Sequence, residues 1–252
     1  MSAGDQDLAG KLQRLTAPQR ELLEEVIAAL GRKVSVARGE GSDLATSEFA
    51  DSIANRLLLH HATTEEKFNK KSFEYALKRA FEAAGLVAKI TDSQTSQGAD
   101  LVAGGTKFSL KTEAAAGISE SKLTISKLME ARWIRDCRTK ADFAKGVRER
   151  VLPALAHVDR ILVLRALDRP RQLVEYELVE IPLSVLRAMG DVGAASFKQR
   201  TKNGSSSTQV TYRRSKAFRL VLDGSVEKVT VSGLEKSLCQ VHCSWLVPAS
   251  RS

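Results

Sequence analysis

Apolar and polar residues alternate along two short runs between positions 100 and 113, and the runs flank Gly104-Gly105. Such a Gly-Gly pair predicts a β-hairpin, because a two-residue turn of the primed type needs positive φ. In this register residue 101 faces 108 and residue 100 faces 109. Opposed residues share a face of the hairpin. One face is therefore predicted to be apolar, with Leu101, Ala103, Phe108 and Leu110. The other face carries Asp100, Ser109, Lys111 and Glu113.

The rest of the chain alternates between helical and strand patterns. Helical spacing of apolar residues predicts helices over 16–30, 43–61, 63–84, 121–136, 141–151 and 182–189. Short apolar or alternating runs predict strands over 86–90, 158–164, 173–181, 217–222, 228–232 and 237–247. We expect residues 1–15 to be disordered, 91–98 to be a polar loop and 196–216 to be a basic flexible insertion. No repeat or linker interrupts the pattern, so residues 1–252 are predicted to form one α/β (α+β) domain.

The charge balance narrows the function classes. The chain has 252 residues and a net charge of +9, which favours a polyanionic partner, with nucleic acid first and an anionic membrane second. No apolar run is long enough to span a bilayer, and the polar N-terminus is not a signal peptide. Three unevenly spaced cysteines fit a reducing, cytoplasmic location better than a disulfide framework. Neither His60-His61 nor the Cys239–Cys243 cluster has the ligand set of a metal site.

Cations are concentrated in two segments. The run from 196 to 219 contains no acidic residue and has a Gly-Ser centre. It is either a solvated basic loop or a loop that clamps phosphates on DNA. Its candidate DNA-binding residues are Lys198, Arg200, Lys202, Arg213, Arg214 and Lys216. A second group, near the end of the predicted 121–136 helix, consists of Arg132, Arg135 and Arg138.

The polar face of the hairpin has the residue types of a metal-dependent hydrolase. Asp100 and Glu113 supply hard oxygen ligands for a divalent cation, and Lys111 lies between them on the same face. Such a lysine can position or deprotonate water and stabilise charge on a phosphate. The alternative is an exposed charged sheet face without chemistry. Glu74, beside the apolar face of its helix, is either solvated or reaches over the sheet edge toward the metal.

An Asp, a hairpin and a lysine resemble the PD-(D/E)XK nuclease motif, although Ala99 and Ser109 stand where the motif has proline and an acidic residue. Longer stretches, HHATT, FEYA, KTEAAAGIS and VEIP, resemble in the same order the SmaI-type restriction endonucleases. The resemblance implies a restriction-endonuclease-like mixed central β-sheet flanked by helices. It also implies a Mg²⁺-dependent homodimer that cuts double-stranded DNA at a G·C-rich, CCCGGG-like palindrome. A cognate DNA methyltransferase would protect the same site in the host.

The resemblance assigns roles to particular residues. Asp100 corresponds to the metal-binding aspartate, Lys111 to the motif lysine, and the backbone carbonyl of Leu110 to a further ligand. Glu113 is our choice for the second carboxylate in place of Ser109, since both share a strand face. The alternatives that remain open for this carboxylate are Glu74, Glu120 and Glu130. The implied reaction is phosphodiester hydrolysis by metal-activated water, leaving a 5′-phosphate and a 3′-hydroxyl.

Two other functions remain open from the sequence. A nuclease of the same fold can be specific for branched or damaged DNA rather than for a sequence. A DNA-binding protein without catalysis is the third hypothesis, with Ser109 marking a decayed site. Cutting of plasmid into discrete fragments separates the first hypothesis from the other two.

Overall fold

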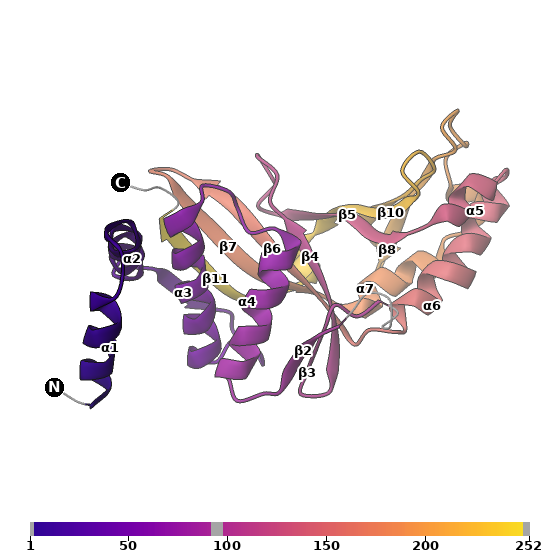
Figure 1. The fold of residues 1–252 in the computed structure, drawn as a ribbon. Helices are drawn as coiled ribbons and strands as arrows, with labels where there is room; N and C mark the ends of the chain where they lie inside the picture. The colour runs from indigo at the N-terminus through magenta and orange to yellow at the C-terminus, as the bar shows by residue number, and fades with distance from the viewer. Residues whose placement is uncertain (1–2, 92–97, 249–252) are drawn as a thin grey trace.

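A seven-stranded mixed sheet forms the centre of the computed structural model, which describes residues 3–91 and 98–248. Its strand order is β1-β11-β7-β6-β4-β3-β2, and β4–β6 is its parallel pair (Figure 1). The strands are β1 (Ser35–Arg38), β2 (Ala88–Ile90), β3 (Leu101–Ala103), β4 (Thr106–Glu113), β6 (Arg160–Arg169), β7 (Leu173–Ile181) and β11 (Gln240–Pro248). The predicted mixed central sheet is confirmed.

The middle of this sheet is buried on both faces. In β6, the run ILVL sends Leu162 and Leu164 into one core and Ile161 and Val163 into another. Near-continuous apolar runs of this kind are typical of strands covered on both sides. The first core contains α3 (Ser47–Thr63) and α4 (Lys70–Ala83), which cover one face of the sheet (Figure 1).

A second, four-stranded antiparallel sheet belongs to the core on the other face, with strand order β5-β10-β9-β8. Its strands are β5 (Lys122–Glu130), β8 (Ser206–Tyr212), β9 (Ser215–Asp223) and β10 (Lys228–Glu235). The helices α5 (Lys140–Gly146), η2 (Val147–Val151), α6 (Leu152–Leu155) and α7 (Leu183–Arg187) contribute to the same core. We call the four-stranded sheet and these helices the four-stranded lobe. Short 3-10 turns add η1 (Arg132–Asp136), η3 (Ala188–Asp191), η4 (Ala194–Ser196) and η5 (Lys236–Leu238).

The hairpin has the predicted register. Leu101 pairs with Phe108 and Ala103 with Thr106. Gly104 and Gly105 both have positive φ, 54° and 84°, as a type I′ turn requires. The apolar face is buried as expected, and it packs in the core that contains α3 and α4.

Several sequence predictions are wrong. Residues 122–130 of the helix predicted over 121–136 form strand β5, in which Leu123 and Ile125 alternate and pair with β10, whereas residues 132–136 form the 3-10 helix η1. Residues 206–212 of the predicted flexible insertion form strand β8, which pairs with β9. The helix predicted from Thr63 begins at Lys70, where Asn69 accepts a hydrogen bond from the Ser72 N–H at 3.0 Å. The predicted polar loop 91–98 lies mostly outside the described residues.

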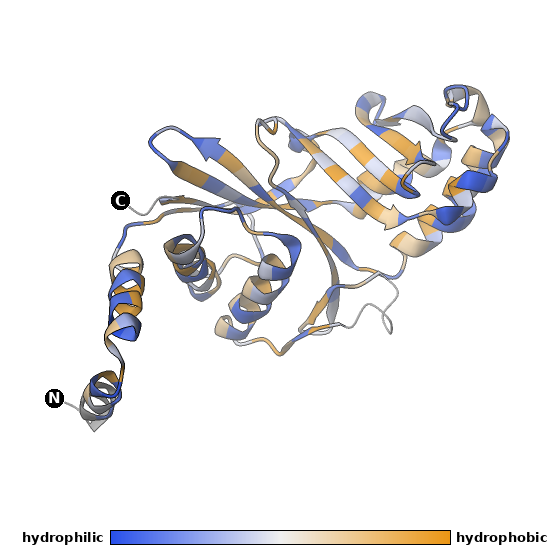
Figure 2. Ribbon diagram, turned by 45° about the horizontal axis from the view of Figure 1, so that its top comes forward, coloured by the Kyte–Doolittle hydropathy of each residue, from blue (hydrophilic) through white to orange (hydrophobic). Residues whose placement is uncertain are grey.

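The N-terminal segment forms helices α1 (Ala3–Gln13) and α2 (Ala17–Leu30), so residues 3–13 are helical within the stretch predicted to be disordered. The predicted cap at Thr16 is present, because the Gln19 side chain accepts the Thr16 N–H at 2.9 Å. Figure 2 shows the two helices at one end of the molecule and the four-stranded sheet at the other. Among the described residues, none of the helices combines the length and apolar character that a membrane span requires.

Candidate active site

Asp100 lies one residue before β3, opposite Ser109, and its side chain is held by the chain itself. Its Oδ2 accepts hydrogen bonds from the Leu110 N–H at 2.6 Å and from the Ser109 hydroxyl at 3.3 Å. Its backbone N–H donates to the Phe108 carbonyl at 2.8 Å. The carboxylate is therefore fixed by the hairpin, and Oδ1 remains free to face other groups.

That second oxygen faces α4. The Lys70 ammonium lies 2.6 Å from Asp100 Oδ1 and 3.5 Å from Glu74 Oε1. Asp100 and Glu74 are each 19% exposed at the side chain, so both carboxylates are partly withdrawn from water. Residues 70 and 74 are neighbours on one helix face. The structure thus brings Glu74 to the hairpin. This agrees with the interpretation that Glu74 reaches over the sheet edge rather than with that of a solvated side chain.

Lys111 shares the strand face of Ser109 and lines a cleft of about 300 Å³ with Lys70 and Lys127. Burial lowers the pKa of the Lys111 ammonium, and the nearby charge of Lys70 acts in the same direction. Asp100 and Glu74 oppose this shift. The opposite wall of the cleft is formed by β5, from Ile125 to Met129. Asp100, Glu74, Lys70 and Lys111 are consequently one electrostatic cluster at a cleft.

The structure does not bring Glu113 to Asp100. Glu113 is four residues beyond Ser109, which is about 13 Å along a strand. Its Oε2 pairs with the Arg165 guanidinium at 2.7 Å, and its Oε1 accepts the Thr124 N–H at 2.7 Å. Arg165 is fully buried and also pairs with Glu177 at 2.7 Å. Both oxygens of Glu113 are engaged in a buried network that joins β4, β5, β6 and β7.

The remaining candidate carboxylates lie in other surroundings. Glu120 pairs with Arg169, and Glu130 pairs with Lys127 at 2.7 Å. Both glutamates are exposed. Within residues 3–91 and 98–248, no three His, Cys, Asp or Glu side chains form a metal-binding group. Any metal held here would therefore rest on two carboxylates together with other oxygen donors, such as a backbone carbonyl, water or phosphate.

The nine cations predicted to contact DNA all lie on or beside the lobe of the four-stranded sheet. Arg132 and Arg135 pair with Glu227, and the Arg138 guanidinium donates to the Arg135 carbonyl at 3.2 Å. Five others are exposed and lie in loops, in a turn or near the end of a strand: Lys198, Lys202, Arg213, Arg214 and Lys216. Arg200 is half-buried.

Arg213 and Arg214 form the two-residue turn between β8 and β9, with φ of 49° and 67°. Positive φ strains a non-glycine residue by about 1 kcal/mol or more. The two-residue hairpin turn requires this conformation, and it presents both arginines at the exposed tip of the β8–β9 hairpin.

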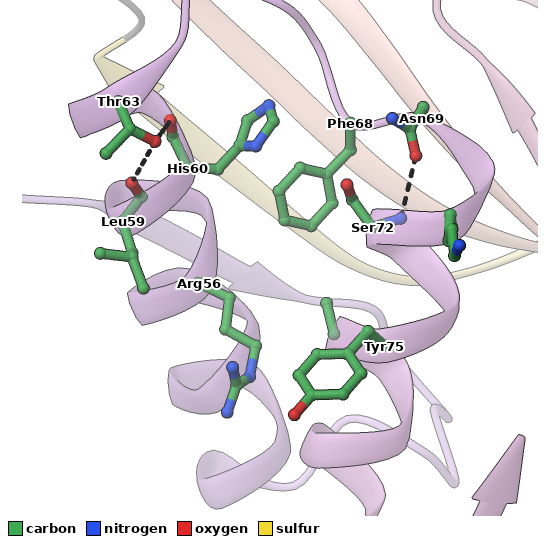
Figure 3. A pocket seen from close by; sticks show the side chains of 10 residues that line it. Arg56, Leu59, His60, Thr63, Phe68, Asn69, Ser72 and Tyr75 are labelled. Atoms are coloured by element: carbon green, nitrogen blue, oxygen red, sulfur yellow. Dashed lines mark hydrogen bonds between the residues drawn. The ribbon is translucent and has the colours of Figure 1, made fainter.

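A larger groove of about 540 Å³ lies between α3 and α4 (Figure 3). Figure 3 shows Arg56 and Tyr75 facing each other across it, and the guanidinium carbon lies 5.9 Å from the ring centroid. Lys71 lines this groove, whereas Lys70 lines the cleft. None of the predicted catalytic residues lines the groove.

His61, His242 and Cys243 make contacts within the fold, whereas Cys239, which was predicted to be a strand residue, lies just before β11. His61 is buried, and its Nε2 lies 2.9 Å from the Tyr176 hydroxyl. Burial, with the neighbouring His60, lowers the pKa of His61 to about 4, so the ring is neutral at physiological pH. His242 and Cys243 are residues of β11, and His242 Nε2 lies 2.9 Å from Glu180.

Comparison with known proteins identifies the family of this chain. Residues 8–247 match the family model described as Type II site-specific deoxyribonuclease. The chain belongs to the SmaI family of these enzymes. The Type II restriction enzyme SmaI of Serratia marcescens is 31% identical over 211 residues, which are 81% of each chain.

A solved structure, a restriction endonuclease in complex with substrate DNA, is also similar to this chain. The likeness covers 73% of this chain and 70% of the other, with 12% identity and a TM-score of 0.35.

Two residues of this region were missed by sequence reasoning. Lys70 lies between the two carboxylates, and Arg165 binds Glu113. An arginine within the apolar run of β6 was a detectable signal for Arg165, because a buried charge needs a partner. Lys70 gave no comparable signal, since it is one of three lysines among residues 67–71.

Proposed function

We propose that the chain is a Type II restriction endonuclease that hydrolyses both strands of a short G·C-rich palindrome resembling CCCGGG. The observation that carries this proposal is the cluster of Asp100, Glu74 and Lys111 at a cleft in a chain of the SmaI family. Family membership supports the reaction class, and the geometry supports the residues. The products would carry a 5′-phosphate and a 3′-hydroxyl.

The donor set fits Mg²⁺. Two carboxylates already converge on one cation, the Lys70 ammonium, and carboxylate oxygens are the ligands that Mg²⁺ prefers. Asp100 and Glu74 would hold the ion, together with the Leu110 backbone carbonyl in the family pattern. The bound ion supplies an acidified water and positive charge next to the scissile phosphate. Of the two leading carboxylates, Glu74 is favoured over Glu113, because both oxygens of Glu113 are engaged elsewhere.

Other residues of the chain orient Asp100, stabilise charge on the phosphate and hold β4 in place. The hairpin backbone holds Asp100 in one orientation through the Leu110 N–H. The Lys111 ammonium faces the cleft, where it can stabilise negative charge that develops on the phosphate. Its lowered pKa brings proton exchange with water closer to neutral pH. The buried network around Glu113 ties β4 to β6, which keeps the strand that carries Lys111 in place.

The cations of the four-stranded lobe are proposed to bind the DNA. Phosphate contacts position a duplex, while Arg or Lys contacts to guanine read its sequence. The Arg213-Arg214 turn supports a contact role, because it presents two exposed arginines together at the tip of the β8–β9 hairpin. A palindrome further implies a two-fold homodimer with one site per strand. A cognate methyltransferase would be the functional partner that protects host DNA.

A plasmid digest tests the proposal. Protein incubated with a sequenced plasmid and Mg²⁺ should give discrete fragments with 5′-phosphate ends. Asp100→Ala and Lys111→Ala should each lower the cutting rate by at least about 100-fold, the size of effect expected when an electrostatic group of the transition state is lost. Both variants should still bind duplex in Ca²⁺.

The control is Lys71→Ala, which removes a lysine next to the site on α4 but from the other groove. Its cutting rate should equal that of the unaltered protein. Cutting of branched or damaged DNA without fragments from linear duplex would instead favour a repair nuclease. Binding without cutting under any divalent metal would favour a decayed site and reject the proposal.

A further inference from the structure

Lys70 occupies an electrostatically unfavourable place in its own helix. It is the first residue of α4, where the helix dipole places partial positive charge. Its neighbour at i+4 is Glu74, and lysine preceding glutamate is the weaker order for such a pair. Interactions within α4 therefore do little to stabilise the ammonium at this position.

The contact that fixes the ammonium comes from outside the helix. Lys70 Nζ lies 2.6 Å from Asp100 Oδ1, closer than the 3.5 Å to Glu74. Burial lowers the pKa of Lys70, but the hydrogen bond and charge of Asp100 outweigh it, so the pKa is raised overall. The ammonium is charged at neutral pH and lies at the point where the two carboxylates converge.

Asp100 does not need Lys70 for its orientation. Its other oxygen, Oδ2, is held by the Leu110 N–H and the Ser109 hydroxyl. Lys70 therefore engages the oxygen that the hairpin leaves available to a cation. A Lys70 variant should keep Asp100 in place and change only what competes for Oδ1.

We propose that Lys70 is an internal competitor for the catalytic cation, and that its release onto a DNA phosphate couples metal binding to DNA binding. The proposal rests on the function proposed above. A divalent cation that binds Asp100 and Glu74 must displace the Lys70 ammonium. This competition weakens metal binding when no DNA is bound. Lys70 is 45% exposed and lines the cleft with Lys111, so the displaced ammonium has a route to a bound phosphate.

Thermodynamic linkage gives this exchange a measurable form. If DNA receives the ammonium, DNA must strengthen metal binding by the same factor by which metal strengthens DNA binding. The enzyme would then hold its cation tightly only when a duplex occupies the cleft. Lys70 is thereby a positioning residue, distinct from the catalytic Asp100 and Lys111.

Calorimetric titration with Ca²⁺ alone tests the proposal on the full chain, in the unaltered protein and in Lys70→Gln and Lys70→Met. Lys71→Gln is the matched control, since it removes the same charge from the next residue, which lines the other groove. Without DNA, both Lys70 variants should bind Ca²⁺ about tenfold more tightly, while Lys71→Gln stays within about twofold. Thermal unfolding checks that the variants are folded.

A second titration adds a duplex containing the site mapped by the plasmid digest. DNA should tighten Ca²⁺ binding to the unaltered protein and should tighten it much less in the Lys70 variants. Equal Ca²⁺ affinities for the Lys70 and Lys71 variants would overturn the competitor role while leaving a protein that still cuts plasmid. A protein that neither binds Ca²⁺ nor cuts would overturn both this inference and the proposed function.

Discussion

Glu74 and Glu113 are alike in chemistry but differ in what surrounds them. Glu74 faces one flexible ammonium at the edge of a cleft, and that ammonium can move away. Glu113 is buried against a fully buried arginine and a backbone N–H. A carboxylate that binds metal must have an oxygen to offer, whereas one in a saturated buried pair serves the fold.

Paired substitutions distinguish these two roles. Glu74→Gln should lower the cutting rate by at least about 100-fold and change the free energy of unfolding by less than about 0.5 kcal/mol. Glu113→Gln should destabilise the protein by about 2 kcal/mol, because Arg165 loses one of its two buried carboxylate partners and keeps only Glu177. Urea unfolding and the cutting rate per folded molecule measure the two effects. The assignment is reversed if Glu113→Gln stays fully stable and loses cutting.

At the scale of elements, the sequence is most informative where local chemistry decides the structure. The Gly104-Gly105 turn fixes the hairpin and therefore the shared face of Asp100 and Lys111, so both were predictable. Strand β5 was not, because its apolar spacing also fits a helix, and only pairing with β10 decides the outcome. Glu74 reaches the site through packing of α4 on the sheet, which no local pattern specifies.

The edge strand β1 depends on a close approach that only glycine allows. A Cβ at Gly39, which follows β1, would lie 1.8 Å from the carbonyl oxygen of Val241 in β11. Gly39→Ala should therefore lower the free energy of unfolding by about 2 kcal/mol, as overpacking does. Gly193→Ala, where nothing lies within 4 Å, is the control and should be close to neutral. Urea unfolding of the two variants measures the difference, and equal stabilities would contradict the prediction.

On the scale of the whole molecule, the candidate DNA contacts are concentrated at one end. The helices α1 and α2 lie at one end, and the lobe with the candidate DNA contacts lies at the other (Figure 1). The net charge of +9 attracts DNA from any direction, but only contacts to phosphate release counterions. Salt dependence therefore reports which end of the molecule touches the duplex.

Replacing Arg213 and Arg214 together by serine should reduce the slope of log affinity against log salt by about 2, since each lost phosphate contact removes about 0.9. Duplex binding in Ca²⁺ at several salt concentrations provides the measurement. The control replaces Arg14 and Arg20, two exposed arginines of the N-terminal segment, and removes the same charge. If both pairs change the slope equally, general attraction rather than contact by the β8–β9 turn explains the binding.

The pairing of β5 with β10 also has a consequence for how the enzyme is made. The two strands are separated by about 100 residues of chain, from Glu130 to Lys228 at their closest pair. Contacts between such distant segments form late, because the intervening chain must first be ordered. On the ribosome, β5 emerges long before β10, so the cleft wall from Ile125 to Met129 lacks its partner strand until β10 has been synthesised. A growing chain would thus complete this cleft only after β10 has emerged.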